Sequence, residues 1–258
     1  MKRLRWLPAI FIAFFLFGCY EVNEELVLNE NGTGRFSTKM DLSQLIDMMQ
    51  NMGGDQMTQE GLDKVIDTII SMKNFADSAK DITPQQRQLL SQGKLHMQMN
   101  MKEKIFKIDT DLPFKSYDDL QLLLSGTGSM SALGDAMKKV FDKGTPEKTD
   151  QPDTAKDPGL DQLTNIFDVV AKNGTLSKKI NQDKFKILME KPEMEQMKQL
   201  TGAGLEILYT TVIKLPRPVI SSDNPLVKLS DDKKTVTLKY NYLELFDTPD
   251  KFSYTITY

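Results

Sequence analysis

The alternation of apolar and polar residues near both ends of the chain constrains the fold more than any other feature. Side chains of a β-strand point alternately to opposite faces, so period-two alternation predicts strands with one buried face. The first such run spans residues 22–42 and is interrupted by Asn31-Gly32-Thr33-Gly34, which tolerates positive φ angles. It predicts a β-hairpin. Most of its apolar residues have even numbers: Val22, Leu26, Leu28, Phe36, Met40 and Leu42.

Further alternating runs predict strands in the second half and in the middle of the chain. Residues 205–215, 236–242 and 252–258 alternate clearly, and residues 167–180 predict a second hairpin around Asn173-Gly174. In the middle, the apolar residues of 95–101 are odd-numbered and those of 106–112 are even-numbered. This change of parity predicts a turn or bulge near residues 102–104.

Apolar spacings of three and four predict helices elsewhere. They occur at 42–49 and 62–69, and short apolar patterns at 120–124, 130–141 and 193–200 suggest more. Thr83-Pro84-Gln85-Gln86 has the residues of a capping box, with proline at the first helical position, and Gly93 ends the helix that follows. Ser116 is positioned to cap the helix that carries Leu120.

These elements predict an α+β fold with a mainly antiparallel sheet. We expect the N-terminal and C-terminal strands to form this sheet and the helices to pack on one face of it. Residues 143–158 are rich in Pro, Asp, Lys and Thr, so 142–159 is interpreted as a disordered linker or loop. It would separate an N-terminal α+β lobe, 19–141, from a C-terminal β-rich lobe, 160–258.

Residues 1–18 have the organisation of a secretory signal peptide. Lys2, Arg3 and Arg5 are followed by twelve residues, 6–17, without charge. This run is too short to cross a membrane, which takes about 20 residues. The segment is therefore expected to be removed, and its three basic residues with it, which changes the formal net charge from −3 to −6.

Leu16-Phe17-Gly18-Cys19 resembles the lipobox of bacterial lipoproteins, which lipoprotein signal peptidase cuts before the cysteine. The resemblance implies a lipid on Cys19 and a chain anchored to the cell membrane or the outer membrane, facing the periplasm or the exterior. A plain secreted protein with an incidental thiol is the alternative. The chain has one cysteine in total, so no intrachain disulfide can form.

Composition disfavours several classes of protein. The acidic balance and the scattered lysine doublets argue against a nucleic-acid partner. One cysteine and one histidine leave no multi-histidine or thiolate metal site, and His96 lies on the polar side of its predicted strand. The nucleotide-binding glycine motifs are absent as well. We therefore predict no cofactor, no metal and no catalytic residue.

Methionine is unusually frequent, with fifteen in the sequence. Met97, Met99 and Met101 alternate on the expected inner face of one strand. Flexible thioethers fill irregular cores, and they also line grooves that accept apolar ligands of varied shape. These three are therefore candidate ligand-binding residues, with core filling as the alternative.

Two stretches resemble the LppM-type bacterial lipoprotein domain family. They are the hairpin at 25–35, close behind the cysteine, and the segment 214–219 with its continuation at 230–236. The resemblance implies an extracytoplasmic α+β domain with lipid or glycolipid binding, and assigns no residue a role. We expect a non-catalytic lipoprotein that binds a lipid-like ligand or an envelope protein. A structural subunit without ligand is the second hypothesis, and an enzyme is the third.

Overall fold

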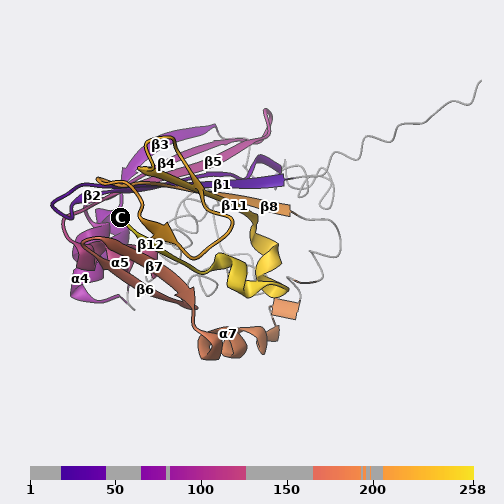
Figure 1. Ribbon diagram of the computed structural model, residues 1–258. Helices are drawn as coiled ribbons and strands as arrows, with labels where there is room; N and C mark the ends of the chain where they lie inside the picture. The colour runs from indigo at the N-terminus through magenta and orange to yellow at the C-terminus, as the bar shows by residue number, and fades with distance from the viewer. Residues whose placement is uncertain are drawn as a thin grey trace, which may run out of the picture.

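The computed structural model describes residues 19–44, 65–79, 82–125, 165–192, 194, 195, 198 and 206–258. Over these residues the chain is α+β, as the sequence predicts, and its strands form two sheets that appear as two layers in Figure 1. The expected helices at 130–141 and most of 42–49 and 193–200 lie outside the described residues. So do residues 1–18 and 142–159.

The larger sheet has eight strands and joins the two ends of the chain. The central strand β1 pairs in parallel with β8, and every other pairing in the sheet is antiparallel. The expected sheet of N-terminal and C-terminal strands is thereby confirmed. The order is β10-β11-β8-β1-β2-β5-β4-β3. The bounds are β1 Cys19–Leu28, β2 Gly34–Asp41, β3 Ile66–Ser71, β4 Lys94–Asn100, β5 Ile105–Phe114, β8 Glu206–Lys214, β10 Lys228–Leu229 and β11 Thr235–Asn241.

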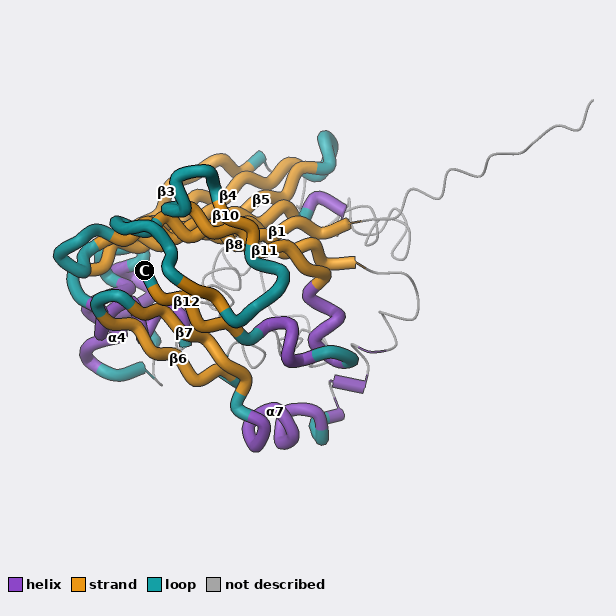
Figure 2. The backbone as a smooth tube through the Cα atoms, in the orientation of Figure 1, coloured by secondary structure: helices purple, strands orange, loops and turns teal. Residues whose placement is uncertain are grey.

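A second sheet of four strands packs against the inner face of the first, which the sequence did not predict as a separate layer (Figure 2). Its order is β6-β7-β12-β9, with β6 Phe167–Lys172, β7 Thr175–Ile180, β12 Tyr254–Thr257 and β9 Ser221–Ser222. Buried residues of both sheets, such as Leu26 and Ile256, belong to one hydrophobic core. Each strand that alternates in sequence thus has its apolar face in this shared core.

Short helices flank the sheets. They are α3 Lys73–Ser78, α4 Pro84–Leu90, α5 Tyr117–Leu124, α7 Gln182–Met189 and the 3-10 helices η1 Tyr242–Phe246 and η2 Pro249–Phe252. The capping box at Thr83 and Gln86 is present, and the Ser116 hydroxyl caps α5 by accepting from the Asp119 amide. None of the helices among the described residues is long and apolar enough to cross a membrane.

The turns predicted from glycine and from parity are confirmed. Gly32 and Gly174 have φ angles of 80° and 81° in the two hairpin turns. The β4–β5 turn lies at residues 101–104, where Lys104 has a φ of 55°. The change of apolar parity between β4 and β5 therefore marks a reversal of the chain.

The helix predicted for 62–69 is wrong over its described part. Residues from Ile66 onward form β3, an edge strand paired with β4. Four of its six residues are β-branched, and such residues lose side-chain freedom in a helix but fit a pleated sheet. Sequence spacing alone could not detect the free edge of β4 that this strand covers.

Candidate binding site between the two sheets

A polar row crosses the inner face of the large sheet. The register places Thr211 of β8, Glu24 of β1, Thr38 of β2 and Thr110 of β5 side by side on four neighbouring strands. The rows on either side are mainly apolar. One includes Tyr209, and the other consists of Val236, Ile213, Leu26, Phe36 and Leu112. The row therefore forms a narrow polar band across a core-facing surface.

Glu24 is the charged member of this row. Its carboxylate accepts hydrogen bonds from the Tyr209 hydroxyl and, at 3.4 Å, from the Thr211 hydroxyl. Its neighbour Glu25 points to the opposite face, where its carboxylate lies 2.7 Å from Lys214 Nζ. The side chains of these two adjacent glutamates thus lie on opposite faces of the sheet.

Lys178 is the charged residue on the inner face of the small sheet. It lies on β7 between the buried residues Leu176 and Ile180, and its Nζ stands 4.4 Å from the centre of the Phe167 ring. Burial lowers the pKa of Lys178, and the negative charge of Glu24 partly offsets this by raising it. Among the described residues, no hydrogen bond or ion pair satisfies the Lys178 ammonium group.

Aromatic rings gather beside Glu24. Tyr209 stacks on Tyr240 and on Tyr242, with ring centres 5.3 Å apart in both pairs, and Phe252 meets Tyr240 edge-on at 4.5 Å. Burial is the main cause that raises the pKa of Tyr209 and Tyr240 well above the ordinary value, and the charge of Glu24 adds to it. The three tyrosines nevertheless keep partly exposed surface. Their rings and hydroxyl groups therefore provide partly exposed aromatic surface next to Glu24.

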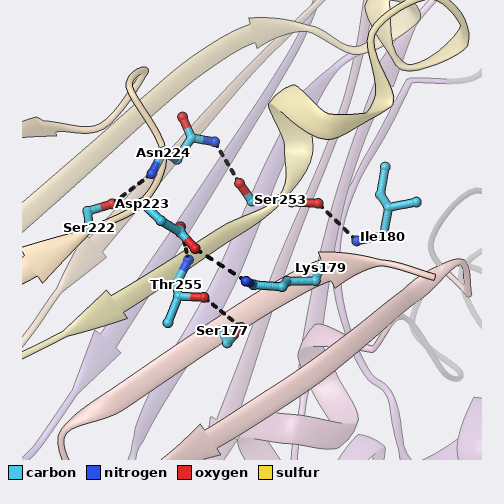
Figure 3. A network of polar contacts seen from close by, with 8 residues as sticks. All are labelled: Ser177, Lys179, Ile180, Ser222, Asp223, Asn224, Ser253 and Thr255. Carbon is cyan, nitrogen blue, oxygen red and sulfur yellow. Dashed lines mark hydrogen bonds and ion pairs between the residues drawn. The ribbon is translucent and has the colours of Figure 1, made fainter. Parts of the chain in front are cut away.

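Polar contacts tie the elements of the small sheet together (Figure 3). The adjacent Lys179 points outward and pairs with Asp223 at 3.3 Å, while Asp223 also accepts from the Thr255 amide. The Asn224 side chain donates to the Ser253 carbonyl, at 2.8 Å. These contacts join β7, β12 and the segment after β9, and so fix the small sheet from which Lys178 projects.

The residues that the sequence singled out are not all in this site. Met97, Met99 and Met101 are 0%, 5% and 8% exposed and belong to the hydrophobic core. This burial fits the core-filling alternative, and ligand contact by them stays a prediction. His96 lies on the outer face, where its Nε2 is 2.7 Å from Asp67. Cys19 is the first residue of β1, whereas Leu16, Phe17 and Gly18 lie outside the described residues.

Sequence reasoning missed Glu24 and Lys178, although both leave a signal. Glu24 occupies an even position in a run whose other inward residues are mostly apolar, and Lys178 occupies the same kind of position between Leu176 and Ile180. A charged residue with apolar parity is rare in a core unless it is paired or functional. The even or odd position of a residue in an alternating run can identify each such charged residue. It does not predict that the two residues lie on two sheets packed against each other.

The described residues contain no group of three or more His, Cys, Asp or Glu side chains suited to a metal ion. A shallow surface depression of about 360 Å³ lies elsewhere, next to α3 and α4, and is lined by side chains that include Lys73, Asp77 and Arg87. It is separate from the charges between the sheets.

Comparison with known proteins adds a single structural likeness. No protein-family model matches the sequence, and no curated protein matches it significantly. The folded domain of LppM from Mycobacterium tuberculosis, determined by NMR, aligns with 93% of this chain and 90% of that domain, at 8% identity and a TM-score of 0.33. A score of this size carries no argument about ligand or activity. The resemblance to LppM-type domains stays a prediction.

Proposed function

We propose that this protein is a lipid-anchored extracytoplasmic lipoprotein that binds a lipid-like ligand without transforming it. The anchor would be an acyl-modified Cys19, and the ligand would lie against the inner faces of the two sheets. The place would be the cell membrane or the outer membrane, on the periplasmic or exterior side.

The single observation that carries the proposal is the partly exposed aromatic group Tyr209, Tyr240 and Tyr242 beside the Glu24 carboxylate on a core-facing strand. Ligand sites are commonly apolar and aromatic, with a few polar groups that fix orientation. An amphiphile matches this combination because it has a long apolar part and a polar end. Anchoring at Cys19 would also hold the domain where such molecules are concentrated.

The test is to purify the protein from its own membrane and to identify what remains bound. Native mass spectrometry in a gentle non-ionic detergent would show adducts that survive detergent exchange, and extraction would give their chemical class. A protein whose mass shows only its own acyl modification after exchange would contradict ligand binding.

A structural or interaction subunit is the second candidate function. One observation favours it: Val65 and Ile69, in and next to the edge strand β3, are each 69% exposed. Exposed apolar residues on a sheet edge suit pairing with another protein. Cross-linking from position 69 in intact cells would capture a partner under this hypothesis and none under the first.

A further inference from the structure

We propose that Asn173 is a site of self-catalysed deamidation, converted to aspartate or isoaspartate, and that the fold directs this reaction to Asn173 and away from Asn31. The inference goes beyond the proposed function and does not depend on it. The chain has two Asn-Gly pairs, Asn31-Gly32 and Asn173-Gly174, and each lies in a hairpin turn whose glycine has a positive φ angle. The two pairs have different surroundings in the structure.

The reaction needs a glycine amide nitrogen that can reach the side-chain amide of the asparagine before it. The Gly174 nitrogen would attack Cγ of Asn173 and form a C–N bond. Its proton would pass through water to the side-chain nitrogen, which leaves as ammonia. Water then opens the cyclic imide at one of its two carbonyls and gives aspartate or isoaspartate. Glycine suits this attack because it has no side chain to hinder the nitrogen.

The Asn31-Gly32 turn holds its nucleophile back. The Gly32 amide donates to the Asn29 carbonyl at 3.0 Å. Gly32 is buried against the Tyr117 ring, where a Cβ atom would lie 2.7 Å from a ring carbon. The Asn31 Oδ1 atom accepts from the amide and the hydroxyl of Thr33, at 3.1 and 2.7 Å. Attack by the Gly32 nitrogen would therefore break a hydrogen bond and turn a peptide that is packed beneath a ring.

The Asn173-Gly174 turn leaves its nucleophile available. The β6–β7 ladder ends at the pair Lys172 and Thr175, so the peptide between Asn173 and Gly174 lies outside it. Neither the Asn173 carbonyl nor the Gly174 amide takes part in a backbone hydrogen bond with another described residue. Asn173 is exposed, and a Cβ atom on Gly174 would meet no atom closer than 3.4 Å. This peptide therefore has room to rotate toward the side chain.

Arg217 gives Asn173 an electrostatic advantage. Its guanidinium donates a hydrogen bond to Oδ1 of Asn173, the oxygen that becomes negatively charged when the nitrogen adds to Cγ. The guanidinium carbon lies 5.4 Å from the centre of the Tyr258 ring, and the prolines Pro216 and Pro218 stiffen the backbone on both sides. A positioned donor stabilises a developing oxyanion more than a neutral amide, so it lowers the barrier.

The product would change the charge at this end of the small sheet. An aspartate at position 173 would place a carboxylate beside the Arg217 guanidinium, where a charge-assisted hydrogen bond replaces the neutral one. An isoaspartate would instead lengthen the backbone of the turn that joins β6 and β7. The first product would keep the hairpin, and the second would disturb it.

The experiment is incubation of the full-length protein, purified in a non-ionic detergent, at a mildly alkaline pH over several weeks. Samples are digested at acidic pH, and the converted peptides around positions 31 and 173 are quantified by mass spectrometry. The same protein unfolded in urea is the reference, because both Asn-Gly pairs are then exposed alike. The variants are Arg217→Met and the control Lys172→Met, which removes a positive charge next to Asn173 but leaves the Arg217 hydrogen bond in place.

We expect the folded protein to convert Asn173 at least about tenfold faster than Asn31, because hydrogen bonds raise the barrier at one pair and lower it at the other. Urea should bring the two rates close together. Arg217→Met should slow the conversion of Asn173 about threefold or more, whereas Lys172→Met should react like the wild type. Circular dichroism would verify that each variant is folded.

Equal rates at the two positions in the folded protein, or faster conversion of Asn31, would overturn the proposal. A preference for Asn173 that persisted in urea would overturn it as well, since the local sequence and not the fold would then be the cause. Absence of conversion at both positions would have the same consequence. An unchanged or faster reaction in Arg217→Met would refute the role of the Arg217 guanidinium.

Discussion

Glu24 and Lys178 lie on the core-facing sides of two different sheets and form no ion pair with each other. Each has an adjacent residue of the same type on the outer face, Lys179 or Glu25, and those outer residues are paired with Asp223 and Lys214. The outer lysine and glutamate are therefore each neutralised by an ion pair, whereas Lys178 and Glu24 on the inner faces do not pair with each other. This contrast supplies a matched control for a substitution of Lys178.

Replacing Lys178 by methionine should raise the free energy of unfolding by about 1 kcal/mol at neutral pH. Burial disfavours the charged form of Lys178, whose pKa it lowers, and an apolar side chain of similar length fits the same face. Denaturant unfolding would measure the change. Lys179→Met should stay within about 0.5 kcal/mol of the wild type, as for other exposed ion pairs. A clear loss of stability in Lys178→Met would show that Lys178 has a stabilising partner.

Stability should fall as the pH rises above about 10. The pKa of Tyr209 and of Tyr240 is raised by burial from an ordinary value of 10.0, so the folded protein keeps protons that the unfolded chain releases. The stabilisation is complete below pH 10 and is lost as pH rises, by up to about 1.4 kcal/mol per pH unit for each such tyrosine. Denaturant unfolding at several alkaline pH values would measure the slope, which Tyr240→Phe should reduce. If the slope were unchanged in Tyr240→Phe, Tyr240 would not be one of the groups that cause the loss of stability at alkaline pH.

Met97→Ala should destabilise the fold by about 2 to 5 kcal/mol, because it truncates a side chain with no exposed surface. Gln98→Ala, on the same strand but the opposite face, serves as the control and should cost much less. Thermal or denaturant unfolding provides the comparison. A small loss in Met97→Ala together with weakened ligand retention would instead favour the binding role of the methionine.

Gly34→Ala should cost about 2 kcal/mol or more. A Cβ atom at this position would collide with the Val27 carbonyl oxygen and with the Phe114 ring, and the backbone oxygen cannot move without breaking the β1–β2 register. Gly174→Ala is the comparison, since its Cβ would meet no closer atom than one at 3.4 Å and the penalty comes from the positive φ, about 1 to 2 kcal/mol. Equal losses in both variants would argue against the collision.

Cys19→Ala should abolish incorporation of labelled fatty acid, because the thiol is the only group at the cleavage motif that can form the thioether. Metabolic labelling with palmitate, followed by immunoprecipitation, would measure it. Labelling at the wild-type level would show that the anchor is attached elsewhere or that the motif is not used.

The fold was predictable wherever a local signal decided it. Period-two alternation located β1 and β2, glycine positions located their turn, and Thr83 located the start of α4, because each depends on residues close in sequence. The helix expected through Ile66 failed because pairing with β4 decided the conformation. The placement of Glu24 and Lys178 on the inner sides of two sheets could not be predicted for the same reason. It depends on how the two sheets pack, and the two residues are 154 positions apart in the sequence.

Because β1 starts at Cys19, it sets the distance between the proposed lipid anchor and the inner face of the large sheet. A strand rises about 3.3 Å per residue, so Glu24, five residues along, lies about 17 Å from the acyl-bearing residue. With β1 beginning at the residue that would carry the lipid, the domain would have almost no reach away from the membrane. Its inner site would stay at one height above one leaflet, so it would exchange molecules with that leaflet and could not carry them across the envelope.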